Sequence, residues 1–377
     1  MKALLEIHLL QNFAPSNLNR DDTGSPKDAY FGGTRRGRIS SQSLKRAIRT
    51  YFKEQHLLSK DYLAIRTKRF LSELVKRLVE LEKLPGESEL AVRNAITAMG
   101  TQKNFKFDAK RPELTEYLFS LGDKEIQKLL ETITQNWGLL TTDKPVISKE
   151  LKRELENTLD GGQAVDIALF GRMLANLPEK NQYAACQVAH AISTHKVEHN
   201  EDFYTAVDDL KPEDNAGADM LGTVEFNSAC YYRYAVIDLT KLRSNLQGDD
   251  ELLLKGVEAF LRSSIFALPT GKQNSFAAHQ LPSFIGFTVR REASPRSLAN
   301  AFETPVRTPQ DGWLNASASA LIREWNDLEG VFGQGGYTQV VNRTEAQLNG
   351  VLRGTRVDNV DTLVSQTLEQ VRATLTV

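Results

Sequence analysis

The apolar positions of the chain form patterns typical of both strands and helices. Unbroken or alternating apolar runs, rich in β-branched and aromatic side chains, predict strands. Val165, Ile167 and Leu169 alternate with other residues in this way just before Gly171. We therefore expect four main strands, over residues 2–10, 164–170, 223–239 and 283–290.

Helical spacing fills much of the sequence between these strands. A helix is expected to begin at Ser40 or Ser41, because either hydroxyl can cap its first turn. Its apolar side is predicted to hold Leu44, Ala47, Ile48 and Tyr51, and its other side Lys45, Arg46, Arg49 and Lys53. Periodic apolar residues and dense Glu/Lys pairs predict mostly helix over 59–160. Further helices are expected over 182–193, 250–269 and 360–377.

This arrangement predicts an α+β protein with a helical block inserted after its first strand and helix. A β-α-β-β-α-β order fits a small sheet packed on helices. That is the ferredoxin-like arrangement, which many RNA-recognition folds use.

Composition narrows the class of protein. The chain has 377 residues, 41% of them hydrophobic, and a formal net charge of −1, so we expect a folded protein whose charges are segregated locally. Cys186 and Cys230 form neither a zinc pattern nor a disulfide framework. No apolar run is long enough for a membrane span, and the N-terminus lacks the features of a signal peptide, so we expect a cytoplasmic protein.

The positive charge is concentrated in residues 32–53, which hold seven cations and no acid: Arg35, Arg36, Arg38, Lys45, Arg46, Arg49 and Lys53. A solvated helix face is the simpler interpretation, but such faces usually carry both signs. Clustered Lys and Arg next to glycines and a helix start favour a phosphate-binding segment. Such contacts bind any nucleic-acid sequence.

Two acidic segments have more than one interpretation. The first contains three aspartates: Asp21, Asp22 and Asp28. Their carboxylates could hold magnesium, or could stabilise turns next to Gly and Pro. Residues 196–221 carry eight acids and two lysines around Phe203 and Tyr204. Those aromatic side chains could stack on bases, or could anchor an ordinary surface loop. No nucleophile motif, Walker lysine or HExxH pattern is present, and we expect no cofactor and no metal.

Several sequence islands resemble the CasC backbone subunits of type I-E CRISPR Cascade complexes. They are SNLNRDD from Ser16, RISSQSLKRA from Arg38, VDIA from Val165 with GRM from Gly171, FYTAVDDL from Phe203 and SLANAFE from Ser297. Residues 54–160 and those beyond about 305 match poorly. The resemblance implies a hand-shaped protein: a palm (1–58, 163–195 and 222–377), helical fingers (59–162) and a thumb hairpin (196–221).

The resemblance further implies a non-enzymatic subunit that oligomerises along a guide RNA, together with other Cascade subunits and without a membrane. Guide-RNA contacts are implied at Arg20, Lys27, Arg38, Ser41, Gln42, Lys45, Arg46, Arg49, Met173, Phe203 and Tyr204. In such a complex the thumb displaces bases at a regular interval, and the remaining bases pair with target DNA. Lys103 and Lys106 are candidates for contacts to that DNA strand. Two alternatives stay open: a metal-dependent ribonuclease that uses Asp21, Asp22 and Asp28, and an RNA-binding module outside CRISPR.

Overall fold

The computed structural model describes residues 2–100, 105–206, 220–307, 312–333 and 335–376, which form two compact units. The first unit comprises Met1–Glu54, Gln187–Thr240 and Val257–Val377, and the second comprises Gln55–Cys186 and Lys241–Gly256. The predicted division into palm, fingers and thumb stays a prediction.

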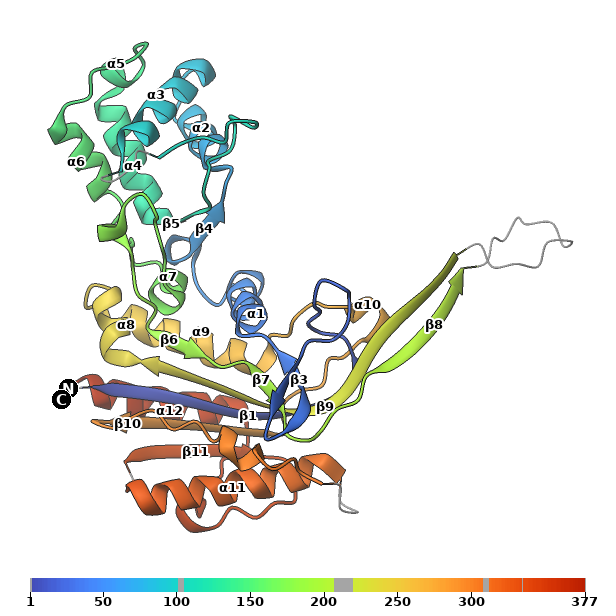
Figure 1. Cartoon of the computed structure of the whole chain (residues 1–377). Helices are drawn as coiled ribbons and strands as arrows, with labels where there is room; N and C mark the ends of the chain where they lie inside the picture. Colours follow the sequence, from blue (N-terminus) through green and yellow to red (C-terminus); the bar gives the residue numbers. More distant parts are fainter. Residues whose placement is uncertain (1, 101–104, 207–219, 308–311, 334, 377) are drawn as a thin grey trace, which may run out of the picture. The chain divides into compact units, whose positions relative to one another are not determined.

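The first unit is built on an antiparallel sheet, ordered β11-β10-β1-β9-β7-β3-β2 (Figure 1). β6 and β8 also pair with β9. Leu5 in β1 pairs with Val289 of β10 on one side and Ile237 of β9 on the other, so β1 is central and almost wholly buried. The strands are β1 (Ala3–Ser16), β2 (Asp28–Phe31), β3 (Thr34–Ile39), β6 (Cys186–Val188), β7 (Ala191–Ser193), β8 (Asn200–Ala206), β9 (Met220–Asp238), β10 (Phe284–Arg291) and β11 (Gly336–Asn342).

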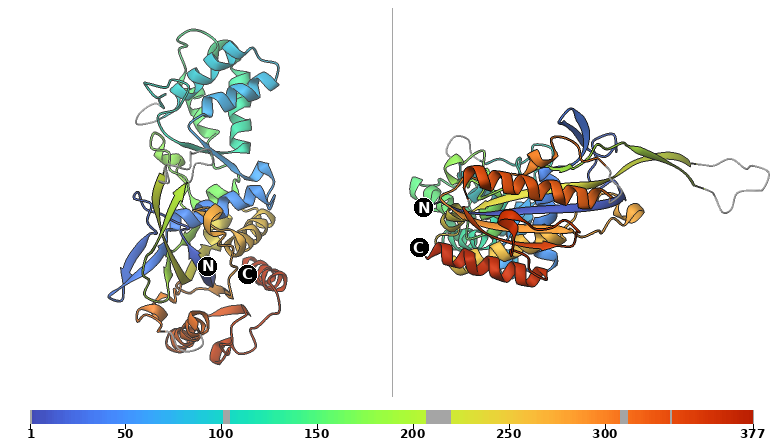
Figure 2. Two further views of the ribbon diagram at one scale, coloured as in Figure 1. Left: turned by 90° about the vertical axis from the view of Figure 1, so that its right-hand side faces the viewer. Right: turned by 90° about the horizontal axis from the view of Figure 1, so that it is seen from below.

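Helices cover both faces of this sheet. Arg290 of β10 contacts Glu329 on α11, whereas the next residue, Arg291, donates to the carbonyl of Ala373 on α12. Because successive strand residues face opposite ways, α11 and α12 lie on opposite faces of β10 (Figure 2). The helices of this unit are α1 (Ser41–Glu54), α10 (Gln273–Phe276), α11 (Gly312–Phe332) and α12 (Val360–Leu375), with short 3₁₀ turns η3 (Ala299–Phe302) and η4 (Gly350–Leu352). The residues of α8 (Leu239–Asn245) and α9 (Asp250–Phe266) are divided between the two units.

The second unit is mainly helical and has its own apolar core, in which Leu74, Ile96 and Leu129 are fully buried. The unit also contains a two-stranded sheet, β4-β5, which the sequence did not indicate. The elements are η1 (Lys60–Tyr62), β4 (Ala64–Thr67), α2 (Phe70–Glu80), α3 (Pro85–Ala98), β5 (Phe119–Gly122), α4 (Asp123–Gln135), α5 (Trp137–Leu140), α6 (Lys149–Asn157), α7 (Val165–Phe170) and η2 (Pro178–Lys180).

The strand predicted over 164–170 is wrong, because the structure has helix α7 there. Val165 to Leu169 are all buried, so the helix has no polar face and its 3.6-residue period is hidden. The apparent polar position in the alternation, Asp166, is buried because its carboxylate accepts a hydrogen bond from the Ala64 amide at 2.8 Å. Gly171, at a φ of 81°, ends the helix.

The helix predicted over 182–193 is also wrong, because β6 and β7 occupy its place. Ile192 of β7 pairs with Arg38 of β3 and with Tyr232 of β9. Pairing on both sides with distant strands overrides the local helical spacing.

The predicted fold class is confirmed: the protein is α+β, with a palm of the RNA-recognition type. The order β1, α1, β7, β9, α9, β10 reproduces the expected β-α-β-β-α-β pattern, with β7 rather than 164–170 as its second strand. β8 and the start of β9 form the arms of the predicted hairpin, from Asn200↔Phe226 to Ala206↔Met220. In the described parts of the chain, no helix is long and apolar enough to cross a membrane.

Candidate nucleic-acid interface

Helix α1 carries much of the basic segment and is anchored at its first turn. The Ser40 hydroxyl accepts a hydrogen bond from the Ser43 amide at 3.3 Å, as an N-cap does, and Asn19 Oδ1 accepts from the Ser40 amide at 2.8 Å. The helix buries Leu44, Ile48 and Phe52. Ala47 and Tyr51, predicted for the same apolar face, line a surface groove instead.

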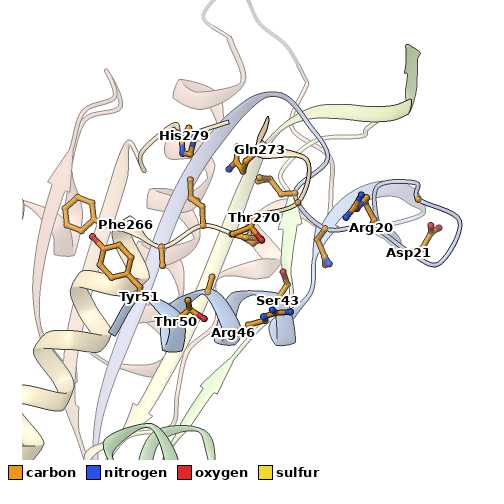
Figure 3. A pocket seen from close by; sticks show the side chains of 18 of the residues that line it. Arg20, Asp21, Ser43, Arg46, Thr50, Tyr51, Phe266, Thr270, Gln273 and His279 are labelled. Atoms are coloured by element: carbon orange, nitrogen blue, oxygen red, sulfur yellow. The ribbon is translucent and has the colours of Figure 1, made fainter. Parts of the chain in front are cut away.

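This groove, of about 900 Å³, lies between α1, the loop 18–24 and the segment 266–279 (Figure 3). Its lining includes the aromatic side chains of Tyr51 and Phe266. Arg20 on the loop and Arg46 on α1 line it as well. Its remaining lining mixes polar groups with two aspartates and a glutamate. These three carboxylates outnumber the two arginines, so a phosphate would have to bind at the guanidinium groups themselves.

The two groove arginines are available to a ligand. Among the described residues, neither the Arg20 nor the Arg46 side chain makes a hydrogen bond or ion pair, and both side chains are exposed. An unpaired guanidinium can bind phosphate through two parallel N–H donors without first breaking an internal contact.

Lys27 and Arg38 line a different cavity, of about 580 Å³, together with Arg35. Arg38 Nε donates to the carbonyl of Asp28 at 2.9 Å, and Arg35 forms an ion pair with the Asp28 carboxylate at 3.1 Å. Glu201 and Glu225 also line this cavity, so its positive charge is partly balanced. A phosphate here would meet fewer free donors than in the groove.

The other predicted α1 residues, which the groove lining does not include, are Ser41, Gln42, Lys45 and Arg49. The Lys45 side chain has no hydrogen bond or ion pair within the described ranges, whereas Arg49 has a partner. The predicted phosphate-binding residues therefore do not all line one groove: Arg20 and Arg46 line the first cavity, and Lys27 and Arg38 line the second.

Histidine 190 occupies the N-terminus of α1, where the sequence suggested an anion. Its Nδ1 lies 3.2 Å from the Ser41 amide, which donates to it, and 3.4 Å from the Arg38 guanidinium. Desolvation, followed by the charges of Arg38 and Lys27, lowers the pKa of His190 and keeps the ring a neutral acceptor. An anion predicted at this helix terminus would therefore have to displace His190 or bind the cationic side chains instead.

One cation of the basic segment has a structural role. Arg36 is fully buried, and its guanidinium donates to the carbonyls of Ser193 at 3.0 Å, Phe302 at 2.8 Å and Glu303 at 3.0 Å. Gly32, at a φ of 55°, lies directly against the Glu303 carbonyl, with no room for a Cβ atom. Gly32 and Arg36 thus dock the β2–β3 hairpin onto η3 and the residue that follows it.

Two of the three aspartates considered as a metal site, Asp21 and Asp28, are already engaged by other groups of the protein. The Asp21 carboxylate accepts hydrogen bonds from the Thr23 hydroxyl and the Thr23 and Ser25 amides, and the Thr23 hydroxyl contributes most to lowering the pKa of Asp21. This is an Asx turn. Asp28 pairs with Arg35. Across the described residues, no group of three or more His, Cys, Asp or Glu side chains is placed to hold a metal ion.

Phe203 and Tyr204, the two aromatic residues of the hairpin, face opposite ways. Phe203 pairs with Thr223 and is 63% exposed, whereas Tyr204 pairs with Gly222 and its ring lies against that glycine. Both rings are therefore exposed, Phe203 more than Tyr204, which is 43% exposed and also covers a strand glycine.

Met173, in the second unit, is held outward by its neighbours. Arg172 is buried in an ion pair with Glu125 at 2.8 Å, and Leu174 is buried in the apolar core. Met173 between them is 78% exposed. Lys106 is exposed in the same unit, while Lys103 lies outside the described residues.

The sequence and the fold were compared with those of known proteins. No curated protein matches the sequence. A solved structure titled "CRISPR RNA-guided surveillance complex, pre-nicking" contains a chain 30% identical to this one, with a TM-score of 0.84 over 98% of this chain and 100% of the other. A chain of another, titled "CRISPR RNA-guided surveillance complex", is 26% identical, with a TM-score of 0.74 over 97% and 99%. The model of the family described as CT1975-like protein matches residues 5–369. Since that match spans nearly the whole sequence, the chain belongs to the CT1975-like family of Cas proteins.

Proposed function

We propose that the protein is a guide-RNA-binding backbone subunit of a type I-E CRISPR surveillance complex, similar to CasC. The groove on α1 carries this proposal, because the unpaired Arg20 and Arg46 line it together with the aromatic rings of Tyr51 and Phe266. A polymer that is bound for its phosphates, whatever its sequence, suits such a site. The similarity to chains of RNA-guided complexes supports the same role.

Sequence readout would then come from base pairing rather than from the protein. The cations hold the guide backbone, Phe203 and Met173 displace bases at a regular interval, and the remaining bases pair with a target DNA strand, with Lys106 among the contacts to that strand. Another RNA-guided system divides the work between protein and guide in the same way.

In this proposal the subunit is not an enzyme and assembles with neighbouring copies of itself and with other Cascade subunits. The turn that engages Asp21 and the ion pair of Asp28 with Arg35 support a non-catalytic role. Identical copies can bind side by side along one RNA, because each copy makes the same contacts with the phosphates.

The test is charge reversal at the two groove arginines. In the Arg20→Glu, Arg46→Glu double variant, affinity for single-stranded RNA should fall by more than tenfold at ~0.15 M salt. The slope of log K against log salt should become less steep by about 0.7 for each lost contact with a single strand. Binding is measured by fluorescence anisotropy of labelled RNA.

The matched control reverses Arg353 and Arg356, two exposed cations of the first unit on a segment that pairs with β11 instead of contributing to α1. It introduces the same change in net charge and should leave affinity within about twofold, because only clustered cations at the site contribute. Equal losses in both double variants would refute the site. Absence of RNA of uniform length in the complex purified with its partner subunits would refute the function.

A further inference from the structure

A short ribbon of the second unit presents two large exposed side chains. Arg172 and Gln182 form an antiparallel bridge with reciprocal backbone hydrogen bonds of 2.8 and 2.9 Å. The Arg172 side chain turns inward to Glu125, and Gln182 Nε2 donates to the Asn245 carbonyl at 3.1 Å. Met173 and Tyr183, the residues that follow each member of the bridge, are both 78% exposed.

Strand alternation accounts for this arrangement. Neighbours of an inward-facing pair point to the other side of the ribbon, so Met173 and Tyr183 share its outer face. Met173 and Tyr183 are diagonal neighbours across the two strands, and in a regular antiparallel pair such neighbours lie about 7–8 Å apart. That is roughly twice the ~3.4 Å spacing of stacked bases.

The backbone on both sides of Tyr183 is fixed. Asn245 Nδ2 donates to the Tyr183 carbonyl and to the Ala168 carbonyl, each at 2.9 Å. A Cβ atom on Gly171 would lie 3.0 Å from the amide nitrogen of Ala184, so the two strands of the ribbon are in close contact.

The Tyr183 ring is held by a cation without being covered. Lys241 Nζ lies 5.1 Å from the ring centroid, at the distance of a cation–π contact. Since the side chain stays 78% exposed, most of the ring remains open to solvent. A positioned aromatic ring, a nearby ammonium and a thioether on one rigid face suit a flat aromatic group attached to a phosphate.

We propose that Tyr183, together with Met173 and Lys241, forms a stacking site for a base of single-stranded RNA. This rests on the proposed function and adds a residue to it: Met173 contacts one side of the base and Tyr183 the other. Stacking on a ring is tolerant of sequence, because every base has a π face. The site therefore retains the lack of sequence preference that a guide carrier requires.

The experiment measures binding of single-stranded RNA containing 2-aminopurine, whose fluorescence changes when the base leaves or enters a stack. In the full-length protein, Tyr183→Ala should weaken binding roughly 5- to 100-fold, the loss typical of one stacked base. Tyr183→Phe should bind within about twofold of wild type, because stacking uses the ring and not the hydroxyl. The slope of log K against log salt should be unchanged in Tyr183→Ala, since no phosphate contact is lost.

Tyr117→Ala, which removes another exposed tyrosine of the same unit, is the matched control and should bind like wild type. If wild-type protein binds RNA and Tyr183→Ala binds equally well with the same fluorescence, the stacking site is refuted and the proposed function stands. If Tyr183→Phe loses affinity as Tyr183→Ala does, the ring is not the binding group, and the stacking site is likewise refuted. If wild-type protein does not bind RNA at all, the proposed function itself fails.

Discussion

The ring of Tyr204 lies against Gly222 on the facing strand, in the space that any Cβ atom at position 222 would need. An aromatic side chain over a strand glycine covers backbone that would otherwise be exposed. Phe203, one residue earlier, points to the opposite face and is 63% exposed, so its ring is open to a ligand. We therefore expect different tasks for the two aromatics, which the sequence presents as one pair.

Alanine substitutions should separate these tasks. Phe203→Ala is expected to weaken single-stranded RNA binding by ~1–3 kcal/mol, the worth of one stacked base, without changing hairpin stability. Tyr204→Ala should mainly destabilise the hairpin. RNA titrations check the first effect, and amide hydrogen exchange along β8 checks the second. Equal losses of RNA affinity in the two variants would contradict the assignment.

Gly222→Ala should displace Tyr204 and destabilise the hairpin by about 1–3 kcal/mol, since the added methyl group overlaps the ring. In a chain that already carries Tyr204→Ala, the same substitution should cost little, because the space is empty. The double-mutant cycle, measured by hydrogen exchange, gives the coupling between the two positions. Additive effects would show that the ring and the glycine do not interact.

The fold was predictable wherever the residues of a segment determine its secondary structure by themselves. The region around Tyr232 is dense in aromatic and β-branched residues and forms β9 as expected. The second palm strand was not predictable, because Ile192 is a strand residue only through its pairing with Arg38 and Tyr232. The fully buried helix α7 has no polar face to reveal its period.

The candidate site was predictable as a region and not residue by residue. The excess of cations in 32–53 predicts a surface that binds a polyanion, but nothing local distinguishes Arg36 from its neighbours. Its acceptors, Ser193 and Phe302, lie 157 and 266 positions further along the chain. Likewise, Asn19 and His190 occupy the first turn of α1 only because the fold brings them there.

Arg36→Lys should destabilise the first unit by about 3 kcal/mol. A lysine ammonium cannot reach the three carbonyls that the planar guanidinium bonds together, and unpaired buried acceptors are unfavourable. Arg35→Lys, one position earlier on the same strand, is the control. Its ion pair with Asp28 is partly exposed, so a change within about 0.5 kcal/mol is expected. Urea denaturation compares the two, and similar losses would contradict the docking role of Arg36.

The purified protein is expected to leave RNA intact in the presence of Mg²⁺ or Mn²⁺. Asp21 is engaged by its turn and Asp28 by Arg35, so Asp22 would have to hold a metal without them. Gel analysis of end-labelled RNA provides the measurement. Cleavage by the wild type that disappears in Asp22→Ala would establish the nuclease alternative instead.

His8 should make the protein sensitive to acid. Burial, assisted by the charge of Arg290, lowers the pKa of His8 from 6.5 to about 3, and its Nδ1 lies 2.9 Å from the Tyr232 hydroxyl. Between these two pH values the unfolded chain binds a proton that the folded chain does not. The contribution of neutral His8 to the free energy of unfolding is therefore complete above pH 6.5. It falls by about 1.4 kcal/mol for each pH unit as the pH is lowered towards 3.

His8→Phe removes the titrating group and retains a ring beside Trp325, whose centroid is 4.6 Å from that of the imidazole. Urea denaturation between pH 7 and 4 should show a shallower loss of stability in this variant than in wild type, even if the variant is less stable at pH 7. The difference between the two slopes isolates His8 from the carboxylates that also titrate in this range. Parallel slopes would mean that His8 is protonated in the folded protein at mildly acid pH, and that its environment is more polar than its burial indicates.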